Sequence, residues 1–192
     1  MTVLPIVIAP DPRLKQKSEP VKEITPQIRD LMEDMLDTMY ASNGIGLAAV
    51  QVGILKRIIV VDTEWDSPRY REEGGVRGDG VGKSNPIRMI NPEIIEASPQ
   101  QRAYNEGCLS FPGQYSEVER PDNVTIRYMD EHGKEQTLHA EGLLATCLQH
   151  EIDHMDGIVF VDHISRLKRD MIMKKLKKAK DHHHVHGDHC HH

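Results

Sequence analysis

Several features that define common protein classes are missing from this chain of 192 residues. Its three cysteines offer no disulfide framework. No segment is apolar over a length that could cross a membrane, and the first residues lack the basic region and apolar core of a signal peptide. The formal net charge of -6 gives no general basic bias of the kind that DNA-binding proteins carry. We therefore expect one domain over residues 1–180, located in the cytoplasm, without a membrane or DNA partner.

The segment from His150 to His154 reads HEIDH and predicts a metal site. Residues four apart on a helix share a face, so His150 and His154 can bind one cation together. Glu151 lies beside the first ligand and can transfer a proton of a water molecule at the metal. Apolar neighbours indicate that the helix is buried, and a buried helix tolerates such polar groups only when a metal and hydrogen bonds satisfy them. The pattern favours a metal-dependent hydrolase.

The third metal ligand must come from upstream of this helix. The chain matches one zinc-peptidase pattern, HExxHxxGxxH, as far as Gly157. At the last ligand position of that pattern the chain has Phe160, which cannot bind a metal. Another class takes a glutamate from a later helix, and no glutamate follows His154 in the sequence. Cys108 is the natural candidate, because a thiolate and two imidazoles leave a fourth position open for chemistry. Such a set can hold iron, zinc, nickel or cobalt.

Three motifs resemble those of the peptide deformylases. Residues 44–51 resemble the GxGLAAxQ motif of that family, residues 106–110 its EGCLS motif, and residues 149–154 its QHExDH motif. They occur in the family's order, and the resemblance extends to about residue 180. It implies hydrolysis of the formyl group from the N-terminal formyl-methionine of nascent peptides. It also implies one divalent metal ion, characteristically Fe(II), held by Cys108, His150 and His154.

The resemblance assigns a role to further residues. Glu151 is expected to act as general base and then general acid, while the side-chain amide of Gln51 and the backbone N–H of Leu109 stabilise the oxyanion. Glu106 and Arg120 are expected to pair and brace the ligand loop. Alternatively, Gln51 is only a polar residue before a strand. Five residues are expected to bind substrate: Ile45, Gly46, Leu143, Thr146 and Cys147.

The substrate-binding residues also have simpler explanations. Gly46 would let a peptide backbone approach closely and pair as an added strand, whereas glycines at 44 and 46 also fit the end of a helix. Leu143 and Cys147 share one helical stripe with His150, which fits a methionine pocket and ordinary core packing equally well. Cys147 is expected to be a pocket or core thiol and not a metal ligand.

The expected fold class is α+β, with antiparallel or mixed sheets packed around the central metal-binding helix and a C-terminal helix. A first helix should span residues 25–42, where Thr25 and Pro26 provide a helix start. Strands are expected at 57–62, 88–97, 124–129 and 134–140, and the metal-binding helix at 141–157. Residues 63–86 are rich in glycine and charge without an apolar period, which predicts a surface insertion.

The C-terminal region contains two further features. Residues 165–180 predict a strongly basic helix, which is either a solvated face or, as the resemblance implies, a contact for ribosomal RNA. Residues 181–192 are rich in histidine and are expected to form a disordered tail whose role the sequence leaves undecided.

Two other function classes stay open at this point. The first is a metallopeptidase of the HExxH type, and Phe160 and the missing downstream glutamate argue against it. A non-catalytic metal-binding or ribosome-associated protein fits the histidine-rich tail and the basic helix. It is weakened because a structural metal site needs neither Glu151 nor Gln51 and normally closes its fourth position.

Overall fold

A five-stranded antiparallel sheet forms the base of the molecule, with strand order β1-β2-β3-β6-β7. The computed structural model describes residues 2–65 and 84–185, with side chains described to residue 179. The strands of this sheet are β1 (Gly46–Ala48), β2 (Ile58–Val61), β3 (Ile87–Ala97), β6 (Asn123–Met129) and β7 (Glu135–Glu141). The α+β class is confirmed, and the four strands expected from the sequence correspond to β2, β3, β6 and β7.

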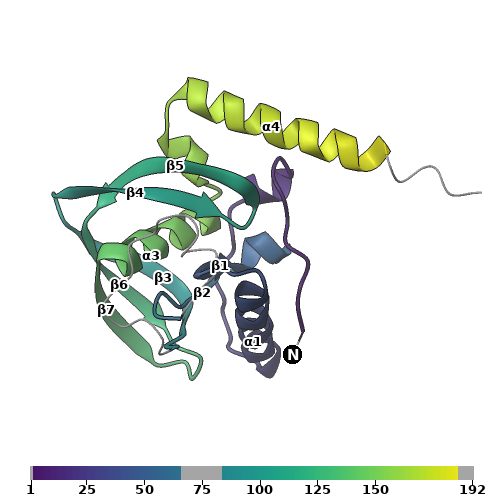
Figure 1. Ribbon diagram of the computed structural model, residues 1–192. Helices are drawn as coiled ribbons and strands as arrows, with labels where there is room; N and C mark the ends of the chain where they lie inside the picture. Colours follow the sequence, from purple (N-terminus) through teal and green to yellow (C-terminus); the bar gives the residue numbers. More distant parts are fainter. Residues whose placement is uncertain (1, 66–83, 186–192) are drawn as a thin grey trace, which may run out of the picture.

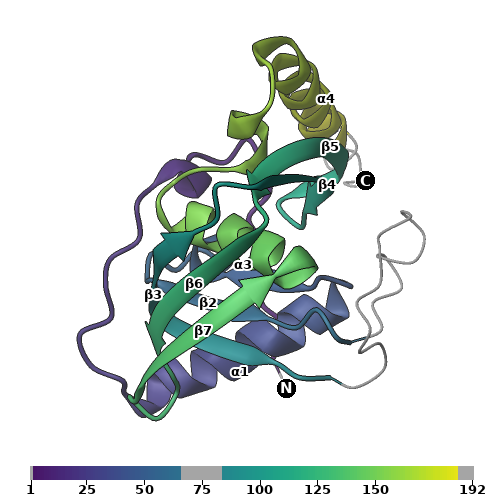
Figure 2. The ribbon, with the colours of Figure 1, turned by 90° about the vertical axis from the view of Figure 1, so that its left-hand side faces the viewer.

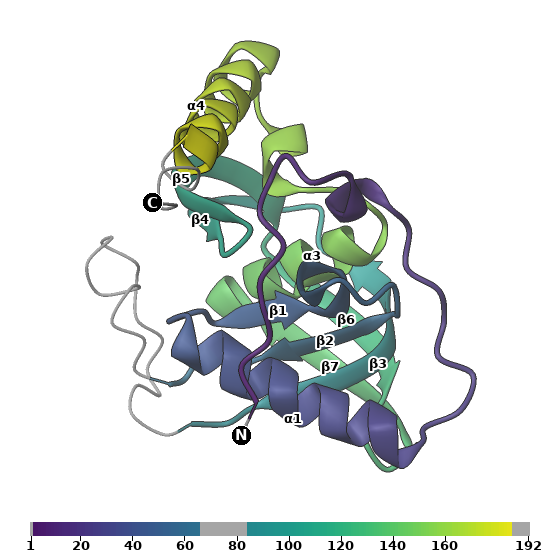
Figure 3. The same ribbon diagram turned by 90° about the vertical axis from the view of Figure 1, so that its right-hand side faces the viewer.

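Strand β2 is buried on both faces, which explains its run of isoleucine and valine. Alternate side chains of a strand point to opposite faces. Ile58 and Val60 belong to a core cluster with α1 (Pro26–Ala41), while Ile59 and Val61 belong to the cluster that contains α3 (Gly142–Met155). Figure 3 shows α1 and α3 on opposite sides of β1 and β2. The sheet is therefore covered by one helix on each face.

The first helix is set by its capping residues and apolar spacing, as expected. Thr25 is the N-cap residue and Pro26 takes the first helical position, where its missing N–H is not needed. The buried side chains of α1 recur at helical spacing. They are Ile28, Met32, Met35, Leu36, Thr38 and Met39.

A hairpin of β4 (Gln101–Cys108) and β5 (Phe111–Pro121) lies on the other side of α3 from the five-stranded sheet (Figure 1). The sequence prediction did not include it, because its two strands are rich in polar residues and lack a continuous apolar run. The pairing shifts register next to Cys108, which pairs with Phe111 after Gly107 has paired with Tyr115. This irregular turn brings Cys108 over α3.

The C-terminal helix α4 (Arg166–Val185) packs on the outside of the hairpin (Figure 2). It buries Ile172 and Leu176 in one cluster with Phe111 and Val118 of β5 and with η3 (Phe160–His163). The helix runs to Val185 and so includes residues 181–185, the first part of the segment that was expected to be disordered. Most of the expected insertion and the end of the tail, residues 66–83 and 186–192, lie outside the described residues.

No helix in the described part of the chain has the length and apolar character needed to span a membrane.

Candidate active site

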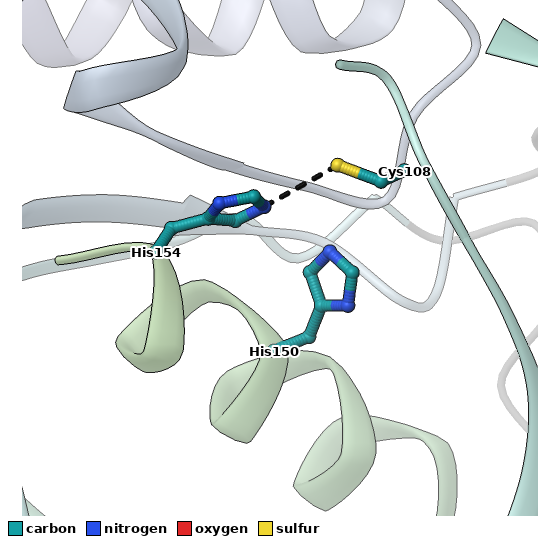
Figure 4. A group of neighbouring side chains, drawn as sticks. All are labelled: Cys108, His150 and His154. Atoms are coloured by element: carbon teal, nitrogen blue, oxygen red, sulfur yellow. Dashed lines mark hydrogen bonds between the residues drawn. The ribbon is translucent and has the colours of Figure 1, made fainter. Parts of the chain in front are cut away.

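Helix α3 brings the two motif histidines together, and β4 supplies the thiol. The rings of His150 and His154 meet edge to face with centroids 4.9 Å apart. Cys108 Sγ lies 3.3 Å from His154 Nε2 (Figure 4). One donor atom from each of the three residues lies within 4.8 Å of the others, and all three residues are buried. Thiolate and imidazole donors at this spacing fit a divalent transition-metal ion with an open coordination position.

Glu106 fixes the orientation of His150. The Nδ1–H of His150 donates to Glu106 Oε2 at 2.9 Å, which leaves Nε2 as the lone-pair donor. Glu106 in turn accepts two hydrogen bonds from Arg120, at 2.5 and 3.0 Å. Burial raises the pKa of Glu106, but its hydrogen bonds with His150 and Arg120 outweigh burial and lower it, so the carboxylate is ionised. The expected Glu106–Arg120 pair is present, and Glu106 bonds His150, one of the three expected metal ligands, directly.

Arg120 also connects the site to a second carboxylate that the sequence interpretation missed. Its Nη1 donates to Asp153 Oδ2 at 2.8 Å, and the same oxygen lies 2.7 Å from Nε2 of His163 in η3. Asp153 stands at a fixed position of the QHExDH motif, but the sequence interpretation gave this residue no role. The guanidinium thus ties β5 to α3, and His163 ties both to the segment that leads into α4.

The side-chain amide of Gln51 has a fixed orientation. Its Oε1 accepts from the backbone N–H of Ala48 at 2.8 Å. The amide nitrogen must therefore face the opposite way, where it donates to Cys108 Sγ at 3.4 Å and to Ser110 Oγ at 3.2 Å. Gln51 is buried. A fixed N–H donor beside the thiol is suited to stabilising negative charge in the cavity.

Glu151 is buried beside the donor set and is free to handle a proton. Its Oε2 accepts no hydrogen bond from any residue in the described ranges. Burial raises the pKa of Glu151 to about 7. A carboxyl group with a pKa near the working pH both accepts and returns a proton readily.

The two histidines differ in protonation. Burial lowers the pKa of His154 well below its ordinary value, so this imidazole is neutral and keeps a lone pair for a metal. Burial also lowers the pKa of His150, but its hydrogen bonds with Cys108 and Glu106 outweigh burial and raise it well above the ordinary value. A cation bound by His150 Nε2 therefore displaces a proton, which makes metal binding depend on pH.

A cavity of about 400 Å³ opens beside the three donors. Its walls come from the segment before β1, from β4 and from α3. It includes all five residues expected to bind substrate, together with Gln51, Leu109 and Glu151. Several lining residues were absent from the sequence interpretation because they carry no motif signal: Asn43, Arg102, Tyr104 and Tyr115.

Gly46 is a glycine because the site leaves no room for a side chain. A Cβ atom at this position would lie 2.5 Å from Glu151 Oε1 and 2.7 Å from Cys147 Sγ. The thiol of Cys147 donates to the Ile45 carbonyl at 3.6 Å, and burial raises its pKa well above the ordinary value. Cys147 is therefore a protonated thiol in the cavity wall, separate from the Cys108 group.

Comparison with known proteins agrees with this geometry. The family model described as polypeptide deformylase matches residues 3–170. The peptide deformylase of Rhizobium meliloti (strain 1021) is 50% identical over 179 residues, covering 93% of this chain and 95% of the relative. A crystal structure of peptide deformylase from Ehrlichia chaffeensis in complex with actinonin is 42% identical, with a TM-score of 0.82, and the match covers 93% of this chain and 98% of that one.

A plant peptide deformylase of known crystal structure is more distant at 32% identity. Its TM-score is 0.80, and the match covers 97% of this chain and 94% of the plant chain. The shared fold therefore spans the hairpin, both helices that cover the sheet and the metal-binding motif. Since the family model matches most of the chain and a relative is half identical over nearly its whole length, the chain belongs to the polypeptide deformylase family.

Proposed function

We propose that the cavity is the active site with which this peptide deformylase removes the formyl group from the N-terminal formyl-methionine of new peptides. The observation that carries the proposal is the position of the buried Glu151 carboxyl group next to three metal donors from α3 and β4. Family membership favours this reaction over peptidase activity and over a non-catalytic metal-binding role.

Cys108, His150 and His154 would hold one divalent ion. When bound there, the ion lowers the pKa of a water molecule towards neutrality and polarises the formyl carbonyl. We favour Fe(II), which the resemblance of the three motifs implies, although this donor set also accepts zinc, nickel and cobalt. An oxidised thiolate would no longer bind the metal, so a reducing compartment suits this site, and we place the enzyme in the cytoplasm.

The protein's own groups supply the proton and charge transfers. Glu151 accepts the proton of the attacking water and passes it to the departing amine. The amide N–H of Gln51, held by the Ala48 bond to its oxygen, donates to the developing oxyanion. The backbone N–H of Leu109 follows Cys108 directly and provides the second donor.

The methionine side chain would occupy the cavity between β1 and α3. Ile45, Leu143, Thr146 and Cys147 line it with mostly apolar surface. Gly46 lines the cavity, and its missing side chain leaves room for Glu151 and Cys147 beside β1. The peptide backbone would pair with β1 there as an added strand. Actinonin is bound by the related enzyme from Ehrlichia chaffeensis, which makes it a suitable inhibitor for testing this cavity.

Formate release from formyl-Met-Ala-Ser tests the proposal. Protein purified without oxygen should release formate, lose activity after treatment with a chelator and regain it on addition of Fe(II). Actinonin should inhibit the reaction in competition with the peptide. Absence of formate release from fully metal-loaded protein would refute the function, and unchanged activity after complete metal removal would refute the role of the three donors.

We further propose that α4 contacts ribosomal RNA while the peptide emerges. Support comes from the exposure of cationic side chains on this helix, which buries Ile172 and Leu176 and leaves its lysines between residues 168 and 178 in solvent. Phosphate contacts of this kind weaken steeply as salt rises. The exposed basic residues of α4 include Arg166, Lys168, Lys174, Lys175, Lys177 and Lys178.

Reversing these charges should weaken ribosome binding without disturbing the active site. A variant with Lys174, Lys175, Lys177 and Lys178 changed to glutamate keeps the buried side chains of α4. We expect it to co-sediment with ribosomes at least tenfold more weakly at low salt, because each phosphate contact contributes to affinity. Its formate release from a short peptide should match the original protein. Equal co-sedimentation of both proteins at low salt would disprove the contact.

A further inference from the structure

Asp62, directly after β2, accepts five hydrogen bonds from three separate parts of the chain. Its Oδ1 accepts from the backbone N–H groups of Glu64 and Trp65, at 3.0 and 3.1 Å. Its Oδ2 accepts from the hydroxyls of Tyr40 and Ser84, at 2.7 and 2.8 Å, and from the backbone N–H of Asn85 at 3.1 Å. Asp62 is 1% exposed, so this carboxylate is fully enclosed by donors.

These bonds hold Trp65 against the rim of the cavity. Trp65 is the single tryptophan of the chain. Its ring meets that of Tyr40 edge to face at 5.0 Å, and its Nε1–H donates to the carbonyl of Gly44 at 2.8 Å. Gly44 lines the cavity, whereas Trp65 is outside the set of lining residues. The indole therefore holds a residue of the cavity wall without lining the cavity itself.

The wall that Trp65 supports is the open edge of β1. The N–H of Asp62 donates to the Ile45 carbonyl at 2.9 Å, and Gly46 stands opposite Val61 in the next position of the ladder. Along an antiparallel strand, the backbone N–H and carbonyl of one residue bond the neighbouring strand, and those of the next residue point away from it. Gly46 therefore directs its backbone N–H and carbonyl away from β2, towards the cavity. Gly44 lies two residues before Gly46. Its backbone N–H donates to the Met39 carbonyl, and its carbonyl accepts the hydrogen bond from the Trp65 indole.

We propose that Trp65 is a positioning residue for the substrate: its bond to the Gly44 carbonyl fixes the open edge of β1 on which the peptide backbone pairs. The inference rests on the proposed function and adds a residue that touches neither the metal donors nor Glu151. Trp65 acts on peptide affinity alone, because it holds a backbone segment that is bound equally by the ground state and the transition state.

The substitution Trp65→Phe tests this role, because phenylalanine keeps an aromatic ring beside Tyr40 and deletes the N–H donor. We expect the KM for formyl-Met-Ala-Ser to rise about three- to tenfold, the fold-change that one net hydrogen bond represents. The kcat and the metal content should stay within about twofold, which is the pattern of lost uniform binding. The Kd of the product Met-Ala-Ser for the metal-loaded protein, measured by calorimetry, should rise by the same factor.

Two further variants make the outcome decisive. Tyr128→Phe deletes a polar group from an aromatic residue of β6 outside the cavity lining, and it should leave KM and Kd unchanged. Asp62→Asn should raise KM, and adding Trp65→Phe to it should raise KM no further if both act through one support.

An unchanged KM in Trp65→Phe, a kcat that falls as much as KM rises, or multiplicative effects in the double variant would each overturn the proposal. Failure of the original protein to release formate would instead refute the proposed function itself.

Discussion

Glutamine at position 151 should lower kcat by about 10²- to 10⁴-fold, the contribution typical of one general base. Glu151→Gln keeps the size of the side chain, so it fits the narrow space beside Gly46. It removes the group that accepts and returns the proton. The three donors Cys108, His150 and His154 do not include residue 151, so metal content should be unchanged. Formate release and metal analysis on the same anaerobic sample measure both quantities.

A matched control separates the loss of the base from the loss of a charge. Glu141→Gln makes the same chemical change at the N-cap of the same helix, where the side chain is exposed. This variant should retain full activity. If Glu151→Gln kept more than a tenth of the original kcat, or if it lost its metal, Glu151 would not be the proton carrier that the geometry indicates.

The part of the site that could be predicted from the sequence is the part encoded locally. The pairing of His150 and His154 follows from helical spacing alone, and α3 places both rings as expected. The buried strand β2 was predicted from its continuous apolar run, and the structure explains that run by a helix on each face. Cys108 was reached by excluding later ligands, and it lies within the donor set.

The rest depends on contacts between residues far apart in the chain. The β4–β5 hairpin buries polar residues such as Glu106 and Arg120, so its sequence lacks the apolar alternation that identifies a strand. Asp153 belongs to the QHExDH motif, but its partners Arg120 and His163 come from other elements, so the motif does not reveal the role of this carboxylate. Trp65 likewise lies in a segment without periodicity, and only the fold brings it to Gly44. No local pattern contains such information.

Arg120 combines several of these long-range contacts in one buried side chain. It is 4% exposed and satisfies both Glu106 and Asp153, which approach it from β4 and α3. Glu106 in turn sets the orientation of His150. Removing the guanidinium would therefore leave two carboxylates without their cation and would release a metal ligand from its support.

Arg120→Met should destabilise the protein by about 3–5 kcal/mol, the range for removing one partner of a buried ion pair. Methionine fills much of the volume, so the loss reports the charge and its hydrogen bonds more than a cavity. Metal affinity should fall about 10- to 100-fold, because Glu106 no longer holds His150 firmly. Denaturant unfolding gives the first quantity and titration with a competing chelator gives the second.

The control for this prediction is an arginine whose ion pair lies at the surface. Arg127 bonds Glu93 at 2.7 Å, and their side chains are 49% and 64% exposed. Arg127→Met should change stability by no more than about 1 kcal/mol, because water and side-chain entropy offset an exposed pair. If both variants lost equal stability, burial of Arg120 would not be the cause. If Arg120→Met were unstable yet bound metal normally, Glu106 would orient His150 without help from the guanidinium. Arg120 would then stabilise the fold without contributing to metal binding.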